Sequence, residues 1–195
     1  MNSLQDKKVI AFVGMPGSGK GTCTDYLHEK HHYPVVHFGN MMYEEVQRRG
    51  LDNVKDEKFV REDMRKKHGK AVLAKLVAQR ADEHFAAGAS VVVLDGLYSW
   101  SEYKYLEQKY GGQLLVIAVA APRAERYKRI LARTDSHRTY TSEAQIRSRE
   151  VDEIENLEKG GPIAGADYTI LNNQRREDLL ASVEALLSQL GLSEM

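Results

Sequence analysis

The stretch GMPGSGKGT, residues 14–22, spaces its glycines and its lysine as a phosphate-binding site requires. It follows the apolar run VIAFV (9–13), so a strand would lead through a glycine-rich turn into a helix. Glycines let consecutive backbone N–H groups curl around phosphate oxygens, where a side chain would intrude. The helix N-terminus adds the positive end of its dipole, and Lys20 adds a mobile charge for the outer phosphates. The spacing predicts a phosphate-cradling loop, and it does not match the G-x-G-x-x-G fingerprint of dinucleotide-binding proteins.

Asp95 is a second candidate for phosphate chemistry, because it ends the apolar run VVVLD. A carboxylate at the C-terminal end of a neighbouring strand could hold Mg²⁺ through water beside the phosphates. The alternative is that Asp95 caps the helix that follows it.

Arginines form a third feature, in the stretch RYKRILAR. Arg126, Arg129 and Arg133 stand at i, i+3 and i+7, a spacing that predicts one shared helix face. Phosphoryl transfer needs such cations, because catalysis depends mainly on positioning and on neutralising charge in a loose transition state. The alternative is a solvated basic face that pairs with acidic side chains. The acidic candidates are Glu143, Glu150 and Asp152.

These residues need a scaffold, and apolar runs of strand length supply one. Besides 9–13, such runs stand at 91–95, 114–120 and 168–171, with a weaker one at 33–38. Stretches of helical length lie between and after them, at 22–31, 70–87, 101–110, 123–133 and 175–190. The alternation predicts an α/β fold with a mostly parallel sheet covered on both faces, and with ligands at the carboxyl ends of the strands.

Two segments exceed this alternation. Residues 39–69 hold two polar helical stretches, and residues 134–161 hold a charged loop and another helix. Both read as insertions over the top of the sheet. Because linkers, repeats and low-complexity tracts are absent from the sequence, we expect residues 1–195 to form one domain.

The composition is that of a globular protein without a charge bias, with 42% hydrophobic and 29% charged residues. Lys plus Arg and Asp plus Glu number 28 each, so we expect neither nucleic acid nor a membrane as partner. The single cysteine, Cys23, excludes an internal disulfide, and we expect it to pack as a small apolar residue. No stretch near the N-terminus reaches membrane-spanning length, and we expect a cytoplasmic protein that is a monomer or a small homo-oligomer. No metal-ligand pattern is evident for His28, His31, His32 and His37.

The phosphate loop departs from the strict motif, because Gly21 separates Lys20 from Thr22. In this form it resembles the G-x-P-G-x-G-K-G-T loop of nucleoside monophosphate kinases, adenylate kinase above all, and LDG and RILAR resemble further segments of that family. The resemblance implies a P-loop NTPase fold, α/β/α in three layers, with a five-stranded parallel sheet. It also implies an acceptor-side helical insert at about 39–69, a short arginine-bearing lid at about 134–161, and ATP and Mg²⁺ as cofactors.

The resemblance also implies roles for individual residues. Lys20 would neutralise the leaving group, Thr22 and Asp95 would place Mg²⁺, and Arg129 and Arg133 would stabilise the transferring group as the lid closes. The residues that would bind the nucleotide are Gly14, Pro16, Gly17, Ser18, Gly19, Lys20, Gly21 and Thr22. Arg138, Arg147 and Arg149 follow in the lid, and surface pairing is an equal alternative for the last two.

The acceptor side departs from adenylate kinase. Tyr43 and Ser99 stand where that family has phosphate-binding arginines, and two lost charge-assisted contacts, roughly 1.5–3 kcal/mol each, argue against AMP. Tyr98 and Trp100 either stack on a base or anchor the next helix. Replacement charges could come from Arg48, Arg49, Arg61 and Arg65, with a salt-bridged surface helix as the alternative for the last two.

The C-terminal third resembles another P-loop kinase family. ADYTILNN (166–173) is similar to the A-D-x-x-I-x-N segment of dephospho-CoA kinases, and the whole chain resembles small P-loop proteins labelled AAA-family ATPase or dephospho-CoA kinase-like. The expected function is transfer of the γ-phosphate of ATP–Mg²⁺ to a nucleotide-like small molecule. The alternative is an ATP-hydrolysing switch that acts on a macromolecular partner. A GTPase is not expected, because the guanine motif N-K-x-D does not occur.

Overall fold

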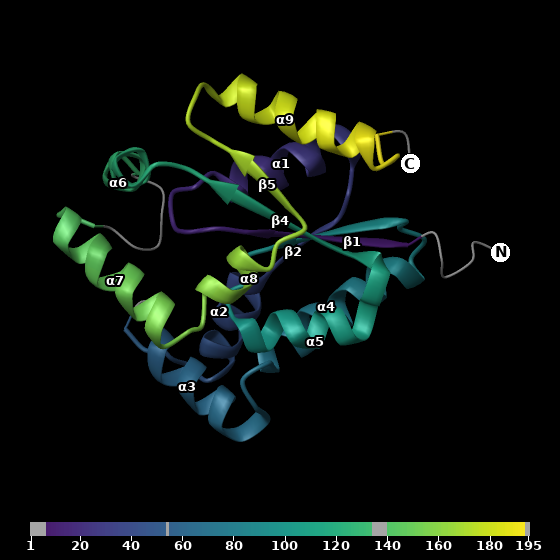
Figure 1. Cartoon of the computed structure of the whole chain (residues 1–195). Helices are drawn as coiled ribbons and strands as arrows, with labels where there is room; N and C mark the ends of the chain where they lie inside the picture. Colours follow the sequence, from purple (N-terminus) through teal and green to yellow (C-terminus); the bar gives the residue numbers. More distant parts are fainter. Residues whose placement is uncertain (1–6, 54, 134–139, 194–195) are drawn as a thin grey trace.

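A five-stranded parallel sheet forms the centre of the part that the computed structural model describes, residues 7–53, 55–133 and 140–193 (Figure 1). The strands are β1 (Lys8–Val13), β2 (Val35–His37), β3 (Val91–Asp95), β4 (Leu114–Ala120) and β5 (Tyr168–Leu171). Their order, β2-β3-β1-β4-β5, places the strand before the phosphate loop in the middle. Phe12 pairs with Asp95 in the register of β1 and β3, so the loop and this carboxylate leave the sheet at the same edge.

Helices cover both faces of the sheet, as the apolar runs predicted. Alternate β1 residues pack to opposite sides, with Val9 on the side of α4 (Val72–Ala86) and α5 (Trp100–Tyr110), and Ile10 on the side of α1 (Lys20–His31) and α9 (Arg176–Gln189) (Figure 1). Cys23 of α1 is fully buried among the second group, as expected. The predicted P-loop α/β fold is confirmed.

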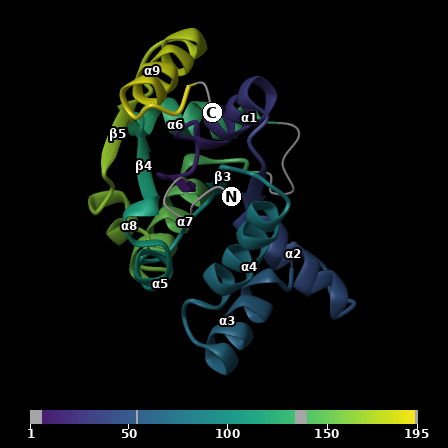
Figure 2. The ribbon, with the colours of Figure 1, turned by 90° about the vertical axis from the view of Figure 1, so that its right-hand side faces the viewer.

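The remaining helices gather around the carboxyl edge. The insert between β2 and β3 forms α2 (Phe38–Arg48) and α3 (Glu57–His68), which lie beside α4 and away from α9 (Figure 2). After β4 come α6 (Arg123–Leu131), α7 (Glu143–Glu155) and α8 (Gly160–Ala164), and a short 3₁₀ turn, η2 (Gly111–Gln113), precedes β4. The part of the expected lid at 134–139, with Arg138, lies outside the described residues.

One expected boundary is wrong. The predicted helix 123–133 ends at Leu131, because the last turn tightens and the backbone N–H of Arg133 donates to Ile130 O at 3.3 Å. Arg133 therefore lies beyond the helix instead of on one face with Arg126 and Arg129. Within the described ranges, no helix is both long and apolar enough to cross a bilayer.

Candidate active site

Side chains of the protein donate hydrogen bonds to the backbone carbonyl groups of the phosphate loop. Lys20 Nζ, at the start of α1, folds over the loop and donates to Gly14 O at 2.9 Å and Met15 O at 3.4 Å. Burial lowers the pKa of Lys20 from its ordinary value, and the nearby Asp95 carboxylate opposes that shift.

The next three carbonyls are held from beneath by distant parts of the chain. Arg126 of α6 donates to Pro16 O at 3.1 Å, and Arg129 donates to Gly17 O at 3.4 Å. Asn172, just after β5, donates from Nδ2 to Ser18 O at 2.7 Å. Because these carbonyls face the protein, the N–H side of the loop and the first N–H groups of α1 are left to face a ligand. No pattern in the sequence predicted these hydrogen bonds to the loop.

The backbone of the loop requires glycine at the point where α6 approaches. Gly17 has φ 76°, and a Cβ at this position would lie 2.6 Å from the Arg126 carbonyl oxygen. The hydroxyl of Ser18, 1% exposed, has no hydrogen-bond partner in the described part of the chain and lies against Gly14. A buried hydroxyl without a partner carries a free-energy cost within the loop.

A cavity of about 330 Å³ opens over the loop. Of the residues predicted for the site, it is lined by Pro16, Gly17, Gly19, Lys20, Gly21, Asp95 and Arg133. Its other lining residues are Tyr43, Tyr98, Ile130, Tyr140, Ile146, Arg149 and Lys159. Gly14 and Ser18 are buried within the loop, Thr22 is half-buried in the first turn of α1, and Arg129 lies beneath the loop.

Asp95 forms a pair that sequence reasoning missed. His37 Nδ1 lies 3.1 Å from Asp95 Oδ2, and this hydrogen bond raises the pKa of His37. His37 and Asp95 are register partners at the ends of β2 and β3, so their pairing follows from the strand order, which the sequence did not predict. Among the described residues no group of three or more His, Cys, Asp or Glu could hold a metal. A single carboxylate such as Asp95 still fits Mg²⁺, which takes few protein ligands and shares phosphate oxygens.

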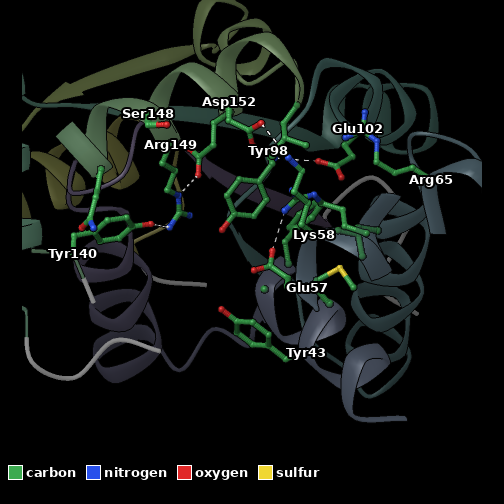
Figure 3. A pocket seen from close by; sticks show the side chains of 18 residues that line it. Tyr43, Glu57, Lys58, Arg65, Tyr98, Glu102, Tyr140, Ser148, Arg149 and Asp152 are labelled. Atoms are coloured by element: carbon green, nitrogen blue, oxygen red, sulfur yellow. Dashed lines mark hydrogen bonds and ion pairs between the residues drawn. The ribbon is translucent and has the colours of Figure 1, made fainter. Parts of the chain in front are cut away.

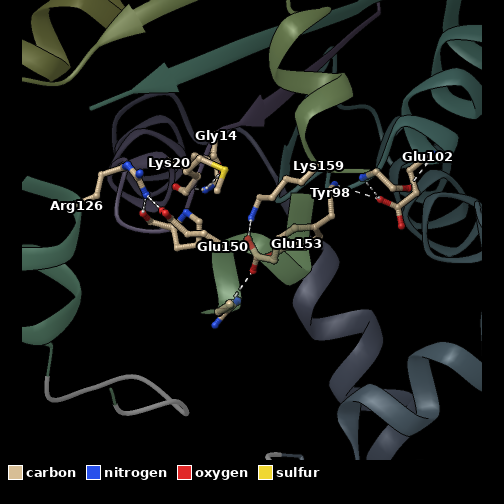
Figure 4. Close-up of polar contacts among 12 residues, drawn as sticks. Gly14, Lys20, Tyr98, Glu102, Arg126, Glu150, Glu153 and Lys159 are labelled. Carbon is tan, nitrogen blue, oxygen red and sulfur yellow. Dashed lines mark hydrogen bonds and ion pairs between the residues drawn. The ribbon is translucent and has the colours of Figure 1, made fainter. Parts of the chain in front are cut away.

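Two acidic residues of α7 form ion pairs with basic residues of the loop support and of the cavity wall. Glu150, 2% exposed, pairs with Arg126 and accepts a hydrogen bond from Tyr127 at 2.8 Å, so Arg126 has the acidic partner that the alternative interpretation expected. Glu153 pairs with Arg149 at 2.7 Å and with Lys159 at 2.5 Å (Figure 4).

Lys159 is a site residue that the sequence did not indicate. Its side chain is 3% exposed, and its Nζ lies 4.8 Å from the centre of the Tyr98 ring. Burial lowers the pKa of Lys159 to about 7, against the opposing attraction of Glu153. A buried lysine that lines the cavity over the phosphate loop and has a lowered pKa is a candidate functional residue.

A second cavity, of about 510 Å³, adjoins the first (Figure 3). Four residues line both cavities: Tyr43, Tyr98, Tyr140 and Arg149. Helix α3 contributes Lys58, Arg61 and Arg65, and the acidic lining residues are Glu57, Glu102, Asp152 and Glu153. Arg61 pairs with Glu57 at 3.0 Å, but its buried Nε has no hydrogen-bond partner among the described residues.

The other two candidate arginines of the insert lie outside this cavity. Arg48 and Arg49 each pair with Glu45 at 2.7 Å. The aromatic pair is also separated by the structure: Tyr98 lines both cavities, whereas Trp100 stacks on Tyr103, 4.7 Å between ring centres, and packs against α8. This packing supports the anchoring interpretation for Trp100.

Comparisons with known proteins agree with this geometry. An AAA domain family model matches residues 13–147. A UPF0200 protein of Sulfurisphaera tokodaii is 31% identical over 94% of this chain and 97% of its own length. A UPF0200 protein of Aeropyrum pernix is 34% identical over 89% of both.

Solved structures support the fold. TT1252 from Thermus thermophilus matches with a TM-score of 0.64 and 22% identity, over 94% of this chain and 98% of its own. A shikimate kinase from Bacteroides thetaiotaomicron gives 0.58 and 14%, over 95% and 99%. A gluconokinase from Sinorhizobium meliloti 1021 gives 0.55 and 15%, over 96% and 98%.

Proposed function

Because this chain belongs to the AAA domain family and to the UPF0200 proteins, with the fold of the P-loop kinases, we propose that it is an ATP-dependent phosphotransferase. It moves the γ-phosphate of ATP–Mg²⁺ to a small, nucleotide-like acceptor. Two structural neighbours, the shikimate kinase and the gluconokinase, are by name kinases of small molecules, which supports this class of reaction.

The observation that carries the proposal is the pair of adjoining cavities. A nucleotide-hydrolysing switch needs only the phosphate loop and its cavity, whereas a kinase also needs room for an acceptor beside the γ-phosphate. The second cavity, about 510 Å³, has the size of a small-molecule site and meets the first along Tyr43, Tyr98 and Arg149.

The proposed chemistry is an in-line displacement. An acceptor oxygen forms a bond to the γ-phosphorus, the bond to the bridging oxygen breaks, and its electron pair stays on ADP. Lys20 neutralises charge on the leaving side, and Arg133, which lines the cavity, stabilises the transferring group. Arg129 contacts the loop from beneath, and its part in transfer stays a prediction.

Asp95 has two proposed roles. Together with Thr22 it would hold Mg²⁺, which would supply neutralisation of phosphate charge. For a hydroxyl acceptor, Asp95 is the carboxylate among the described lining residues of this cavity that can receive the proton.

The acceptor cavity favours a molecule with a flat ring and an anionic group. Tyr43, Tyr98 and Tyr140 offer aromatic surface, and Arg61 and Arg65 offer guanidinium groups one helical turn apart on α3. These side chains differ from the arginines expected for AMP, so AMP remains a poor candidate.

The test is ADP release by the purified protein with ATP–Mg²⁺ and a panel of acceptors: dephospho-CoA, AMP, CMP and dTMP. We expect release that depends on one acceptor class, and loss of turnover in Lys20→Met with the circular dichroism spectrum unchanged. Slow hydrolysis that no acceptor accelerates would contradict the kinase and favour the switch. Undiminished turnover in Lys20→Met would contradict the loop assignment.

A further inference from the structure

We propose that Lys159 is a second phosphate-binding lysine, which contacts the transferring phosphoryl group. This contact lies where the cavity over the phosphate loop, here called the nucleotide cavity, meets the acceptor cavity. This inference rests on the proposed phosphotransferase function and adds a catalytic residue to it. No pattern in the sequence marks Lys159, which stands in the stretch EKGG.

The position of Lys159 relates it to both cavities. Its side chain lines the cavity over the phosphate loop together with Lys20 (Figure 4). It also lies over the ring of Tyr98, and its partner Glu153 lines the acceptor cavity. Lys159 therefore lies in the cavity over the phosphate loop and contacts two residues, Tyr98 and Glu153, that line the acceptor cavity.

The charges around the nucleotide cavity do not balance. Among the described lining residues the cations are Lys20, Arg133, Arg149 and, in its ammonium form, Lys159, and the carboxylate is Asp95. Glu153 pairs with both Arg149 and Lys159, so one carboxylate serves a half-buried and a buried cation. Like charges held together in a partly buried site repel, and an anionic ligand relieves that repulsion.

The backbone before Lys159 is held in an uncommon conformation that fixes its direction. Glu158 has φ 60°, a left-handed value that non-glycine residues rarely adopt. Its carboxylate accepts hydrogen bonds from Ser101 Oγ at 2.8 Å and from Lys70 Nζ, and its carbonyl accepts one from the N–H of Trp100 at 3.3 Å. Backbone strain that the surrounding contacts over-determine is a mark of functional sites.

Close packing of α8 adds to this restraint. A Cβ on Gly161 would lie 2.8 Å from the Cβ of Trp100, so α8 sits directly against the start of α5.

The groups that face Lys159 give it a measurable proton linkage. They are Glu153 and Arg149 from α7, Lys20 from α1 and Tyr98 after β3. Burial lowers the pKa of Lys159 to about 7, so at pH 8 most molecules carry the neutral amine. A polyphosphate beside it favours the ammonium form, and binding then takes up a proton.

The first experiment uses the wild-type protein. Calorimetric titration with ATP–Mg²⁺ in two buffers of different ionisation enthalpy should show uptake of close to one proton per nucleotide at pH 8, and much less at pH 6. Binding without this uptake contradicts the role of Lys159 and leaves the kinase proposal intact. Absence of any nucleotide binding contradicts the proposed function itself.

The second experiment separates a phosphate contact from a structural ion pair. Lys159→Met should lower kcat at least tenfold and abolish the proton uptake. The double variant Lys159→Met/Glu153→Gln removes the unpaired carboxylate, and it should fold but stay equally slow. Recovery of wild-type kcat in the double variant would reduce Lys159 to a counter-ion. Lys109→Met, which breaks the exposed pair with Asp82, is the control and should behave as wild type.

Discussion

Glu102 shows how one side chain serves both the acceptor cavity and a helix end. Its carboxylate accepts hydrogen bonds from the N–H groups of Ser99 at 2.9 Å and Tyr98 at 3.1 Å, and its own N–H donates to Ser99 Oγ at 3.1 Å. This capping box starts α5 at the place where the adenylate kinase pattern expects a phosphate-binding arginine. Ser99 therefore caps a helix, and the proposed acceptor would be held by other residues.

Glu102→Gln should change how stability depends on pH. Burial raises the pKa of Glu102 to about 7 from an ordinary value of 4.5, so the folded state binds this proton more tightly than the unfolded state. The resulting stabilisation is fully present below about pH 4.5 and is lost as pH rises through 7, a change of about 3 kcal/mol. Glutamine keeps an oxygen for the same N–H groups and does not titrate.

Urea denaturation of both proteins between pH 5 and 8 measures this effect. The difference in unfolding free energy between wild type and variant should move in favour of the variant as pH increases. A difference that is constant across this range would show that Glu102 is already ionised at pH 5.

At the scale of the elements, α6 and the end of β5 support the phosphate loop from the side opposite the proposed ligand. The sequence did not predict this support. Arg126 and Arg129 reach it from α6, and Asn172 reaches it from the turn after β5. Arg129 also donates to Asn172 O at 3.2 Å, which links the two supports. The shape of the loop therefore depends on segments more than a hundred residues away in the sequence.

Asn172→Ala should weaken both the fold and nucleotide binding. It leaves the Ser18 carbonyl, buried beneath the loop, without its donor, which costs about 1–3 kcal/mol of unfolding free energy. Nucleotide affinity should fall as well, because the loop loses part of its preorganisation. Denaturation and calorimetry measure the two effects, and Asn173→Ala, at the exposed neighbouring position, is the control. Equal behaviour of the two variants would rule out the support role.

At the scale of the whole molecule, the sheet could be predicted because its strands are continuous apolar runs. Val91–Asp95 and Leu114–Ala120 were expected within a residue of their observed bounds, since buried parallel strands leave this pattern in the sequence. The phosphate loop could also be predicted, because the spacing of its glycines and its lysine is contained in one short stretch of sequence. The end of α6 was misplaced, because a tightened last turn has no sequence signature.

Other parts of the site could not be predicted, because they arise from contacts between distant segments. The pairing of His37 with Asp95 depends on strand order, and the burial of Lys159 depends on how α7 and α8 pack over the loop. The roles of the arginines could not be predicted either. Arg126 pairs with Glu150, whereas Arg133 lines the cavity. The spacing of residues in the sequence predicts which of them share a helix face, but it does not predict what that face contacts.

Nucleotide binding should stabilise the entire fold. The walls of the nucleotide cavity come from α1, α2, α6, α7, the end of β3 and Lys159 just before α8, so a bound ligand connects segments from most of the chain. ATP–Mg²⁺ at a hundred times its Kd should add about 2.7 kcal/mol, or a rise in Tm of roughly 5–10 °C for a protein of this size. Differential scanning calorimetry measures it, and Lys20→Met should show little of the shift. An equal rise in that variant would indicate binding elsewhere.

The burial of Cys23 gives this protein a built-in reporter of global opening. Cys23 is fully buried on the side of α1 that packs on the sheet, and burial raises the pKa of its thiol to about 12. Reactive thiolate therefore forms only when the packing around α1 comes apart. The rate at which a maleimide labels the sequence's single cysteine then measures how often the native state opens, without any engineered probe.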